Sequence, residues 1–271
     1  MAEVTECVYG RVGETPLKLL VQKPKTWQPG DRRTAIVWIH GGGWNSGCAE
    51  QFKKHMEYFS NLGAVDFSIQ YRLQTESVTM EDSLADCRSA IRYLRGKAEE
   101  FGIDSDKIIG AGDSAGGHFA CCLGNPEIVK EEKERVNLVL DFNGVVDLTR
   151  KFRKNLLGEE AARKSVSLTE WKEQYDRAYA ISPALRVCRG HAPVLVMQGM
   201  LDRTVEPEDS VQYHYALKRA GCDSTLVLLP DVSHAFILFD YHLEDAKVYE
   251  ILGKVRDFLT EKQLLNPIWI R

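Results

Sequence analysis

A serine in a glycine-rich turn is the residue with the clearest chemical potential in this sequence. Gly112-Asp113-Ser114-Ala115-Gly116 follows the β-like run Ile108–Ala111 and precedes an apolar run typical of a helix. A serine on such a sharp strand-to-helix turn presents its hydroxyl above the sheet, and the N–H groups at the start of the helix favour negative charge beside it. The pattern predicts a nucleophile for acyl transfer. A glycine turn that only packs a helix close to a strand would show the same residues.

A second glycine run, His40-Gly41-Gly42-Gly43-Trp44, follows the apolar run Ile36–Ile39. In the absence of side chains, backbone N–H groups in such a run can point into a site and stabilise an oxyanion. We expect the N–H groups of Gly42, Gly43 and Ala115 to be the oxyanion donors. The run alone could be a flexible turn, but two such motifs in this order, each after a strand, are far more specific than either one.

The serine needs a base, and seven histidines compete for this role. His234 lies in Asp231-Val232-Ser233-His234, just after the β-like run Thr225–Leu229. A loop that leaves the carboxyl end of the last strand is where the base is expected. We interpret His40 as a residue that holds the glycine loop in shape, and His118 as a packing residue in the helix after the nucleophile.

The third member of the site must orient the imidazole and stabilise its cation. Asp202 follows the β-like run Pro193–Gly199, and the next run along the chain is the one that leads to His234. The chain order Ser114, Asp202, His234 then matches the order serine, acid, histidine that this kind of site shows. Asp147 is the competing acid because it follows the preceding strand, and Asp231 is too close to His234 in sequence to be the first choice.

Short β-rich runs alternate with helical patterns and must position these motifs. Several runs are continuously apolar, as expected of strands that are covered on both faces. The runs are Leu17–Lys23, Ala35–His40, Ala64–Tyr71, Lys107–Gly112, Asn137–Phe142, Pro193–Gly199 and Ser224–Leu229. Apolar residues at steps of three and four predict helices around Leu84–Leu94 and Val248–Leu259. The alternation predicts one α/β domain over residues 1–271, with a mainly parallel sheet of about eight strands between helices.

The stretch 147–190 interrupts this alternation. Ser167-Leu168-Thr169-Glu170 has the residues of a capping box and predicts the start of a helix that carries Trp171 and Tyr175. The stretch is too short for a second domain. We expect a lid over the carboxyl edge of the sheet, where ligands bind in such folds.

Composition excludes several classes of protein. The 271 residues are 44% hydrophobic and 27% charged, an ordinary globular balance, and the formal charge of −4 argues against a general nucleic-acid binder. No run approaches the roughly 18 apolar residues of a membrane span, and the N-terminus has no secretory pattern. The seven cysteines are irregularly spaced without a CxxC pair, which favours reduced thiols and no zinc site. We therefore expect a cytoplasmic protein.

With these residues in order, the sequence resembles the α/β-hydrolase family, in particular its hormone-sensitive-lipase-like and bacterial feruloyl- and acetyl-esterase-like branches. The matching motifs are HGGGW, Tyr71-Arg72-Leu73, GDSAGG and the DVSHAF histidine. The resemblance implies the α/β-hydrolase fold and a triad of Ser114, Asp202 and His234. It also implies an acyl-enzyme mechanism that requires no metal or organic cofactor. The long N-terminal cap of many such enzymes does not precede His40.

The resemblance further implies a serine esterase for short acyl esters, and we expect acetyl esters of small carbohydrate-like alcohols. Four aromatic residues are candidates for substrate contacts, whereas we expect Phe142 in the core. The four are Trp44, Trp171, Tyr175 and Phe236. Two alternatives remain: an arylformamidase-like amide hydrolase and a non-catalytic ligand receptor, which usually lacks a triad member. We expect a small-molecule substrate and no nucleic-acid or membrane partner, and the chain is compatible with a homo-oligomer.

Overall fold

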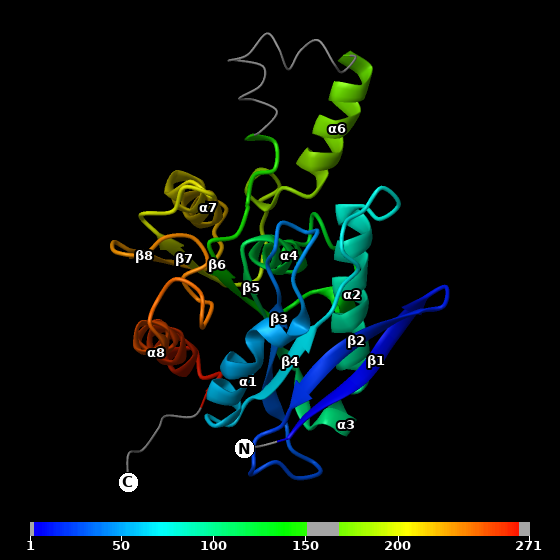
Figure 1. The fold of residues 1–271 in the computed structure, drawn as a ribbon, viewed down its shortest axis with the longest axis vertical. Coiled ribbons are helices and arrows are strands. Elements are labelled where there is room, and N and C mark those ends of the chain that lie inside the picture. Colours follow the sequence, from blue (N-terminus) through cyan, green and yellow to red (C-terminus); the bar gives the residue numbers. More distant parts are fainter. Residues whose placement is uncertain (1–2, 151–167, 266–271) are drawn as a thin grey trace.

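A twisted sheet of eight strands runs through the middle of the molecule (Figure 1). The computed structural model describes residues 3–150 and 168–265. The strand order is β1-β2-β4-β3-β5-β6-β7-β8, with β3 to β8 parallel and the β1–β2 and β2–β4 pairs antiparallel. The strands are β1 (Val4–Val12), β2 (Thr15–Gln22), β3 (Arg33–Ile39), β4 (Val65–Ile69), β5 (Ile103–Asp113), β6 (Leu138–Phe142), β7 (Val194–Gly199) and β8 (Ser224–Leu229). This arrangement confirms the predicted mainly parallel α/β fold.

Helices cover both faces of the sheet (Figure 1). One face packs against α1 (Lys53–Ser60) and α8 (Asp245–Glu261). The other face packs against α2 (Met80–Gly96), α4 (Ala115–Leu123) and α7 (Pro207–Arg219), with the short α3 (Ala98–Phe101) at its side. The remaining helix, α6 (Leu168–Ala180), rises at the top of Figure 1, beyond the ends of the parallel strands. Single turns of 3-10 helix lie at Ala49–Phe52, Glu132–Glu134 and Pro183–Leu185.

Burial on both faces explains why the central strands are continuously apolar. In β3, Ala35 and Val37 belong to the core on the α2 side, whereas Ile36 and Trp38 belong to the core on the α8 side. All four side chains are buried. Because successive residues of a strand point to opposite faces, a strand covered on both sides needs apolar residues at every position.

The strand that sequence analysis missed is β1, at the edge of the sheet. Most of its residues are exposed or half-buried, and it pairs only with β2. A strand of this kind carries polar residues on its outer side, so its composition lacks the apolar run that marked the central strands. The seven runs that were predicted correspond to β2 through β8.

Candidate active site

Ser114 occupies the tight turn between β5 and α4. Its φ of 53° and ψ of −116° are unusual for a residue with a side chain, and its N–H donates to the carbonyl oxygen of Phe142 at 3.0 Å. The turn is possible because Gly116 passes against β3: a Cβ there would lie 1.9 Å from the Ile39 carbonyl oxygen. The glycine is therefore required by close backbone contact, which gives the Gly-x-Ser-x-Gly pattern its physical meaning.

A chain of hydrogen bonds joins the three residues predicted as a triad. His234 Nδ1 lies 2.7 Å from Asp202 Oδ2, and His234 Nε2 lies 2.9 Å from Ser114 Oγ. The carboxylate can only accept, so Nδ1 carries the proton and Nε2 is free to accept the proton of the serine hydroxyl. The three side chains come from the loops after β5, β7 and β8, whose carboxyl ends meet at one edge of the sheet.

Asp202 is held ionised in a closed environment. Its side chain is fully buried, Oδ1 accepts the N–H groups of Thr204 and Val205, and Oδ2 accepts from Gln198 as well as His234. Burial by itself would raise the pKa of Asp202, but the hydrogen bonds from His234 and the Val205 N–H outweigh it and lower the pKa. A carboxylate with this many donors can orient and stabilise an imidazolium without taking its proton.

The two competing acids, Asp147 and Asp231, contact other residues. Asp147 Oδ1 accepts from the N–H and hydroxyl of Thr149. Asp231 pairs with Lys247 at 3.1 Å and is largely exposed. The carboxylate that the structure brings to His234 is that of Asp202.

The glycine loop passes directly beside Ser114. A Cβ at Gly41 would lie 3.4 Å from the Cβ of Ser114 and 2.9 Å from the Asp113 carbonyl oxygen. Gly42, with a φ of 108°, turns the loop, and its carbonyl oxygen accepts the N–H and hydroxyl of Ser46. Because that carbonyl is turned toward Ser46, the loop can present N–H groups rather than oxygens to the nucleophile. This placement is compatible with the expected donors Gly42, Gly43 and Ala115, whose role stays a prediction.

His40 holds the start of this loop in place. Its ring is fully buried and stacks on Tyr71, with ring centroids 4.1 Å apart, and burial lowers its pKa to about 4. Nδ1 lies 2.9 Å from the Gly41 carbonyl oxygen and Nε2 lies 3.3 Å from the Gln70 amide nitrogen. The Tyr71 hydroxyl also donates to the His40 carbonyl oxygen. These contacts support the interpretation of His40 as a residue that shapes the loop.

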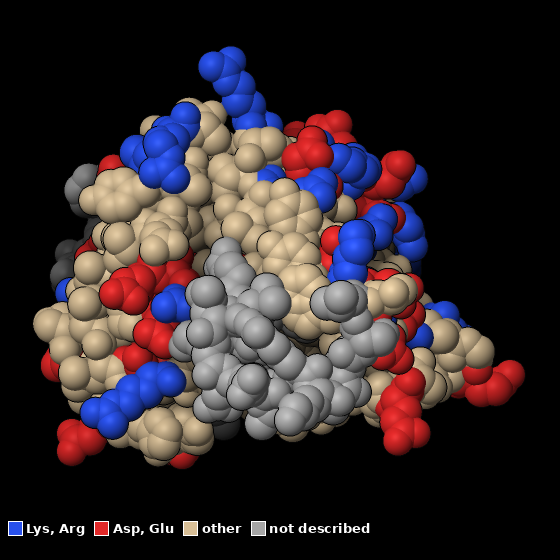
Figure 2. Space-filling model, turned by 90° about the horizontal axis from the view of Figure 1, so that it is seen from above, with Lys and Arg blue, Asp and Glu red and all other residues tan. Residues whose placement is uncertain are grey.

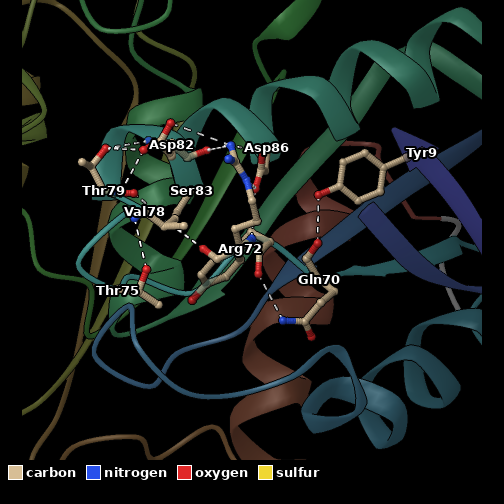
Figure 3. A network of polar contacts seen from close by, with 10 residues as sticks. Tyr9, Gln70, Arg72, Thr75, Val78, Thr79, Asp82, Ser83 and Asp86 are labelled. Carbon is tan, nitrogen blue, oxygen red and sulfur yellow. Dashed lines mark hydrogen bonds and ion pairs between the residues drawn. The ribbon is translucent and has the colours of Figure 1, made fainter. Parts of the chain in front are cut away.

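Residues 70–72, which follow β4, connect His40 to α2 (Figure 3). Arg72 binds Asp86 through two nitrogens, each 2.8 Å from a carboxylate oxygen, and Ser83 donates its hydroxyl to the Arg72 carbonyl oxygen. On the other side, Tyr9 donates to the carbonyl oxygen of Gln70. A bidentate ion pair with a nearly buried carboxylate is geometrically stringent. Tyr71 and Arg72 thus connect the start of the glycine loop to α2.

Asn143 is a site residue that sequence analysis missed. It follows β6 with a φ of 44° and is fully buried. Its Nδ2 donates to Asp113 Oδ1 at 3.0 Å, and its Oδ1 accepts the N–H of Ala235 at 3.2 Å. One side chain thus ties the residue before Ser114 to the residue after His234. The Asn-Gly pair at the end of a strand was the available signal, since asparagine tolerates left-handed backbone.

A cleft of about 690 Å³ is lined by Trp44, which ends the glycine run, and by Arg203, Thr204 and Val205, which follow Asp202, whereas none of the three triad residues lines it. Its walls combine apolar groups such as Trp44, Leu148 and Ile181 with charged groups of both signs. Its lining residues are Trp44, Gln74, Met80, Glu81, Val145, Asp147, Leu148, Arg150, Gln174, Arg177, Ala178, Ile181, Arg203, Thr204, Val205, Glu206 and Asp209. Seen from above in Figure 2, uncharged surface fills much of the middle of this face, with both signs of charge around it.

The four aromatic candidates for substrate contact have different surroundings. Trp44 lines the cleft. Phe236 is only 1% exposed and packs at right angles to Phe142 in the core on the α8 side, so burial leaves it almost no surface for a substrate. Trp171 and Tyr175 stack on each other along α6, with ring centroids 5.3 Å apart. The residues of α6 that line the cleft are instead Gln174, Arg177 and Ala178.

Within residues 3–150 and 168–265, no group of three or more His, Cys, Asp or Glu side chains is arranged to hold a metal ion. No helix in the same ranges is long and apolar enough to cross a membrane.

Comparison with known proteins places this geometry in a family. Ethyl acetate hydrolase of Pseudomonas putida is 28% identical over 250 residues, covering 87% of this chain and 76% of that protein. Acetylxylan esterase of Xylanibacter ruminicola is 23% identical over 219 residues, covering 77% of this chain and 42% of that protein. The chain likewise spans 58% of a mycobacterial esterase, LipQ. These curated relatives are therefore longer than this chain.

A solved structure matches over nearly its whole length. A thermophilic esterase of Thermogutta terrifontis, in its native form, is 33% identical with a TM-score of 0.83, and the match covers 99% of this chain and 95% of that one. The same esterase has been solved with butyrate bound and phosphorylated by paraoxon. A family model described as BD-FAE matches residues 22–217. The chain therefore belongs to the BD-FAE family of α/β-hydrolase esterases.

Proposed function

We propose that this chain hydrolyses short acyl esters, in particular acetyl esters of small carbohydrate-like alcohols, through an acyl-enzyme on Ser114. The observation that carries the chemistry is the hydrogen-bonded chain from Ser114 through His234 to Asp202 beside the glycine loop. Phosphorylation of the Thermogutta esterase by paraoxon supports a reactive serine, since such reagents attack activated nucleophiles.

The proposed reaction has two stages, acylation and deacylation, and in each of them His234 Nε2 accepts a proton and then returns it. Ser114 Oγ attacks the ester carbonyl carbon while its proton passes to His234 Nε2, and Asp202 stabilises the resulting imidazolium. The N–H groups of Gly42, Gly43 and Ala115 bind the oxyanion of the tetrahedral intermediate. The carbon–oxygen bond to the alcohol then breaks, and Nε2–H protonates the departing oxygen. Water loses a proton to Nε2 as it attacks the acyl-enzyme, and Ser114 regains a proton when the carboxylic acid leaves.

The nature of the cleft supports the substrate class. Charged groups, among them Arg150, Arg177 and Glu206, share its walls with apolar side chains. A long acyl chain would leave such groups buried without water, which costs free energy, whereas a small alcohol with hydroxyl groups can hydrogen-bond to them. The butyrate bound to the Thermogutta esterase supports a short acyl group. The name of the Xylanibacter relative supports an acetylated sugar.

We further propose that the stretch 147–190 forms a lid that helps to choose the alcohol. In the described part of this stretch, Arg177 pairs with Glu81 of α2 at 2.8 Å, and Ala178 and Ile181 line the cleft. These contacts support the proposal because they hold the C-terminal half of α6 against the cleft and against α2. Residues 151–167 of the proposed lid lie outside the described residues.

The test is kcat/KM across nitrophenyl esters from acetyl to decanoyl, together with acetylated xylo-oligosaccharides, methyl ferulate and N-formylkynurenine. We expect a maximum at acetyl to butyryl and turnover of the acetylated sugars. A hydrophobic pocket discriminates by only about 1–3 kcal/mol per methylene, so the preference among short chains is graded. A maximum at octanoyl or longer, or a formamide preferred a hundredfold, would refute the proposal. Turnover of nitrophenyl acetate without any acetylated sugar would refute its carbohydrate part.

A further inference from the structure

His118 connects three parts of the site at one buried point. It lies in the first turn of α4, where its N–H donates to the carbonyl oxygen of Ser114. Its ring is fully buried, with Nδ1 at 3.2 Å from the indole nitrogen of Trp44 and Nε2 at 2.7 Å from the carbonyl oxygen of Ile181. The Cys122 sulfur also lies near Nε2, at 3.4 Å. The nucleophile helix, the glycine loop and the end of α6 therefore meet at this ring.

The two main contacts fix the protonation of the ring. The Ile181 carbonyl oxygen can only accept, so Nε2 carries the proton. The Trp44 indole N–H can only donate, so Nδ1 must be unprotonated. A neutral imidazole with its proton on Nε2 satisfies both partners, and burial favours that form by lowering the pKa of His118 to about 4. Both ring nitrogens are therefore occupied, and His118 has no free nitrogen for proton transfer.

The partner of His118 forms a wall of the cleft. Trp44 directly follows the proposed oxyanion donor Gly43 and has a φ of 66°, a conformation that is costly for a bulky residue. Its carbonyl oxygen accepts the N–H of Gln74, and its indole meets the His118 ring edge-on, with centroids 5.7 Å apart. The indole is thus held in place by its backbone and by its N–H. Ile181, the other partner, lines the same cleft.

We propose that His118 is a positioning residue that fixes the Trp44 indole against the end of α6 and thereby sets selectivity for the alcohol part of the ester. The proposal rests on the proposed esterase function and on the cleft as the site of the alcohol. The hydrogen bond keeps the flat face of the indole available to a ring-shaped or bulky alcohol. Without it, Trp44 would keep its strained backbone but could adopt other side-chain rotamers.

The test compares acetates that share an acyl group and differ in alcohol. The measured quantity is the ratio of kcat/KM for phenyl acetate to that for ethyl acetate. Trp44→Phe keeps an aromatic wall but removes the N–H donor together with part of the indole ring, whereas His118→Phe keeps a ring of similar size without an acceptor. Loss of one neutral hydrogen bond corresponds to about a two- to tenfold change, so each variant should lower this ratio by that factor. The double variant should lower it no further, because both changes break the same contact.

A matched control separates this role from general stability. His191 is also buried, bonds through both ring nitrogens and has its pKa lowered to about 4 by burial, but it contacts Ala192 and Tyr213 instead. His191→Phe should lower the melting temperature to an extent similar to His118→Phe and leave the ratio unchanged. If His118→Phe does not fold, Trp44→Phe together with the control carries the test.

Several results would overturn the proposal. These are an unchanged ratio in Trp44→Phe, additive effects in the double variant, or the same change in His191→Phe. A changed acyl-length profile with an unchanged alcohol ratio would also overturn it. Failure of the proposed carbohydrate substrate is distinguishable, because phenyl and ethyl acetate carry no sugar.

Discussion

Removal of the Asn143 side chain should slow catalysis without touching the triad. In Asn143→Ala, the Ala235 N–H and Asp113 Oδ1 both lose their partner inside the protein. Ala235 directly follows His234 and itself has a φ of 58°. The loop that carries the base would then be held less firmly against the turn that carries Ser114. We expect kcat to fall by about 10- to 100-fold, because displacing a reacting group by about 1 Å has an effect of this size.

The cost in stability can be worked from the same contacts. Each buried polar group left without a partner costs about 1–3 kcal/mol, and alanine is less tolerant than asparagine of the φ of 44°. Two such groups cost about 2–6 kcal/mol and the left-handed backbone adds about 1–2 kcal/mol, so the free energy of unfolding should fall by roughly 3–8 kcal/mol. Native domains are stable by about 5–15 kcal/mol, so a parent in the upper part of this range leaves a folded variant that melts at a clearly lower temperature.

The assay is steady-state hydrolysis of nitrophenyl acetate well below the melting temperature of each variant, with urea unfolding of the same samples. Asn125→Ala is the matched control. Asn125 is also fully buried and bonds through both ends of its amide, to Arg186 and Glu127, away from the triad. It should lose comparable stability and keep its kcat. A folded Asn143→Ala with parental kcat, or an equal fall of kcat in Asn125→Ala, would refute the reasoning.

Three further predictions follow from the site. Ser114→Ala should abolish ester hydrolysis with nearly unchanged melting temperature, and an organophosphonate should label the parent at Ser114 only, as read by peptide mass spectrometry; residual turnover or another labelled serine would contradict this. Asp202→Asn should lower kcat by about 10⁴-fold and Asp147→Asn far less, so the reverse ranking would reassign the acid. Burial raises the pKa of Asp141 to about 7, so the folded state keeps a proton that the unfolded chain releases near pH 4. This group therefore lowers stability by up to about 1.4 kcal/mol per pH unit as pH rises from 4 to 7. Asp141→Asn should remove that slope in urea unfolding, and an unchanged slope would show that Asp141 ionises normally.

Sequence alone predicts those parts of this protein in which the local residue pattern is compatible with only one structure. The strands β2 to β8 are recognisable because burial on both faces forces apolar residues at every position. The nucleophile turn is recognisable because only glycine fits where Gly116 meets the backbone of β3. Ser114, Asp202 and His234 follow from the positions of their loops after strands, and their hydrogen bonds agree with that order.

The parts that could not be predicted depend on distant residues. Asn143 bonds to Asp113, 30 positions earlier, and to Ala235, 92 positions later, and nothing near it in sequence indicates those partners. The apolar periodicity of α6 does not say which side faces the cleft, since Trp171 and Tyr175 stack with each other while Gln174 and Arg177 line it. Phe236 follows the base in sequence, but the turn at Ala235 directs it into the core. In each case tertiary packing chooses between options that the local sequence leaves equal.

The contact between Gly116 and the Ile39 carbonyl oxygen has a consequence for how this enzyme can change. It joins the nucleophile turn to the strand that leads into the glycine loop through main-chain atoms alone. The spacing between nucleophile and loop therefore does not depend on which side chains line the cleft. Natural drift or laboratory randomisation of cleft residues such as Met80, Leu148 and Arg203 can then change the walls of the cleft while the position of Ser114 against the glycine loop is kept. Such a scaffold is well suited to the recruitment of new ester substrates.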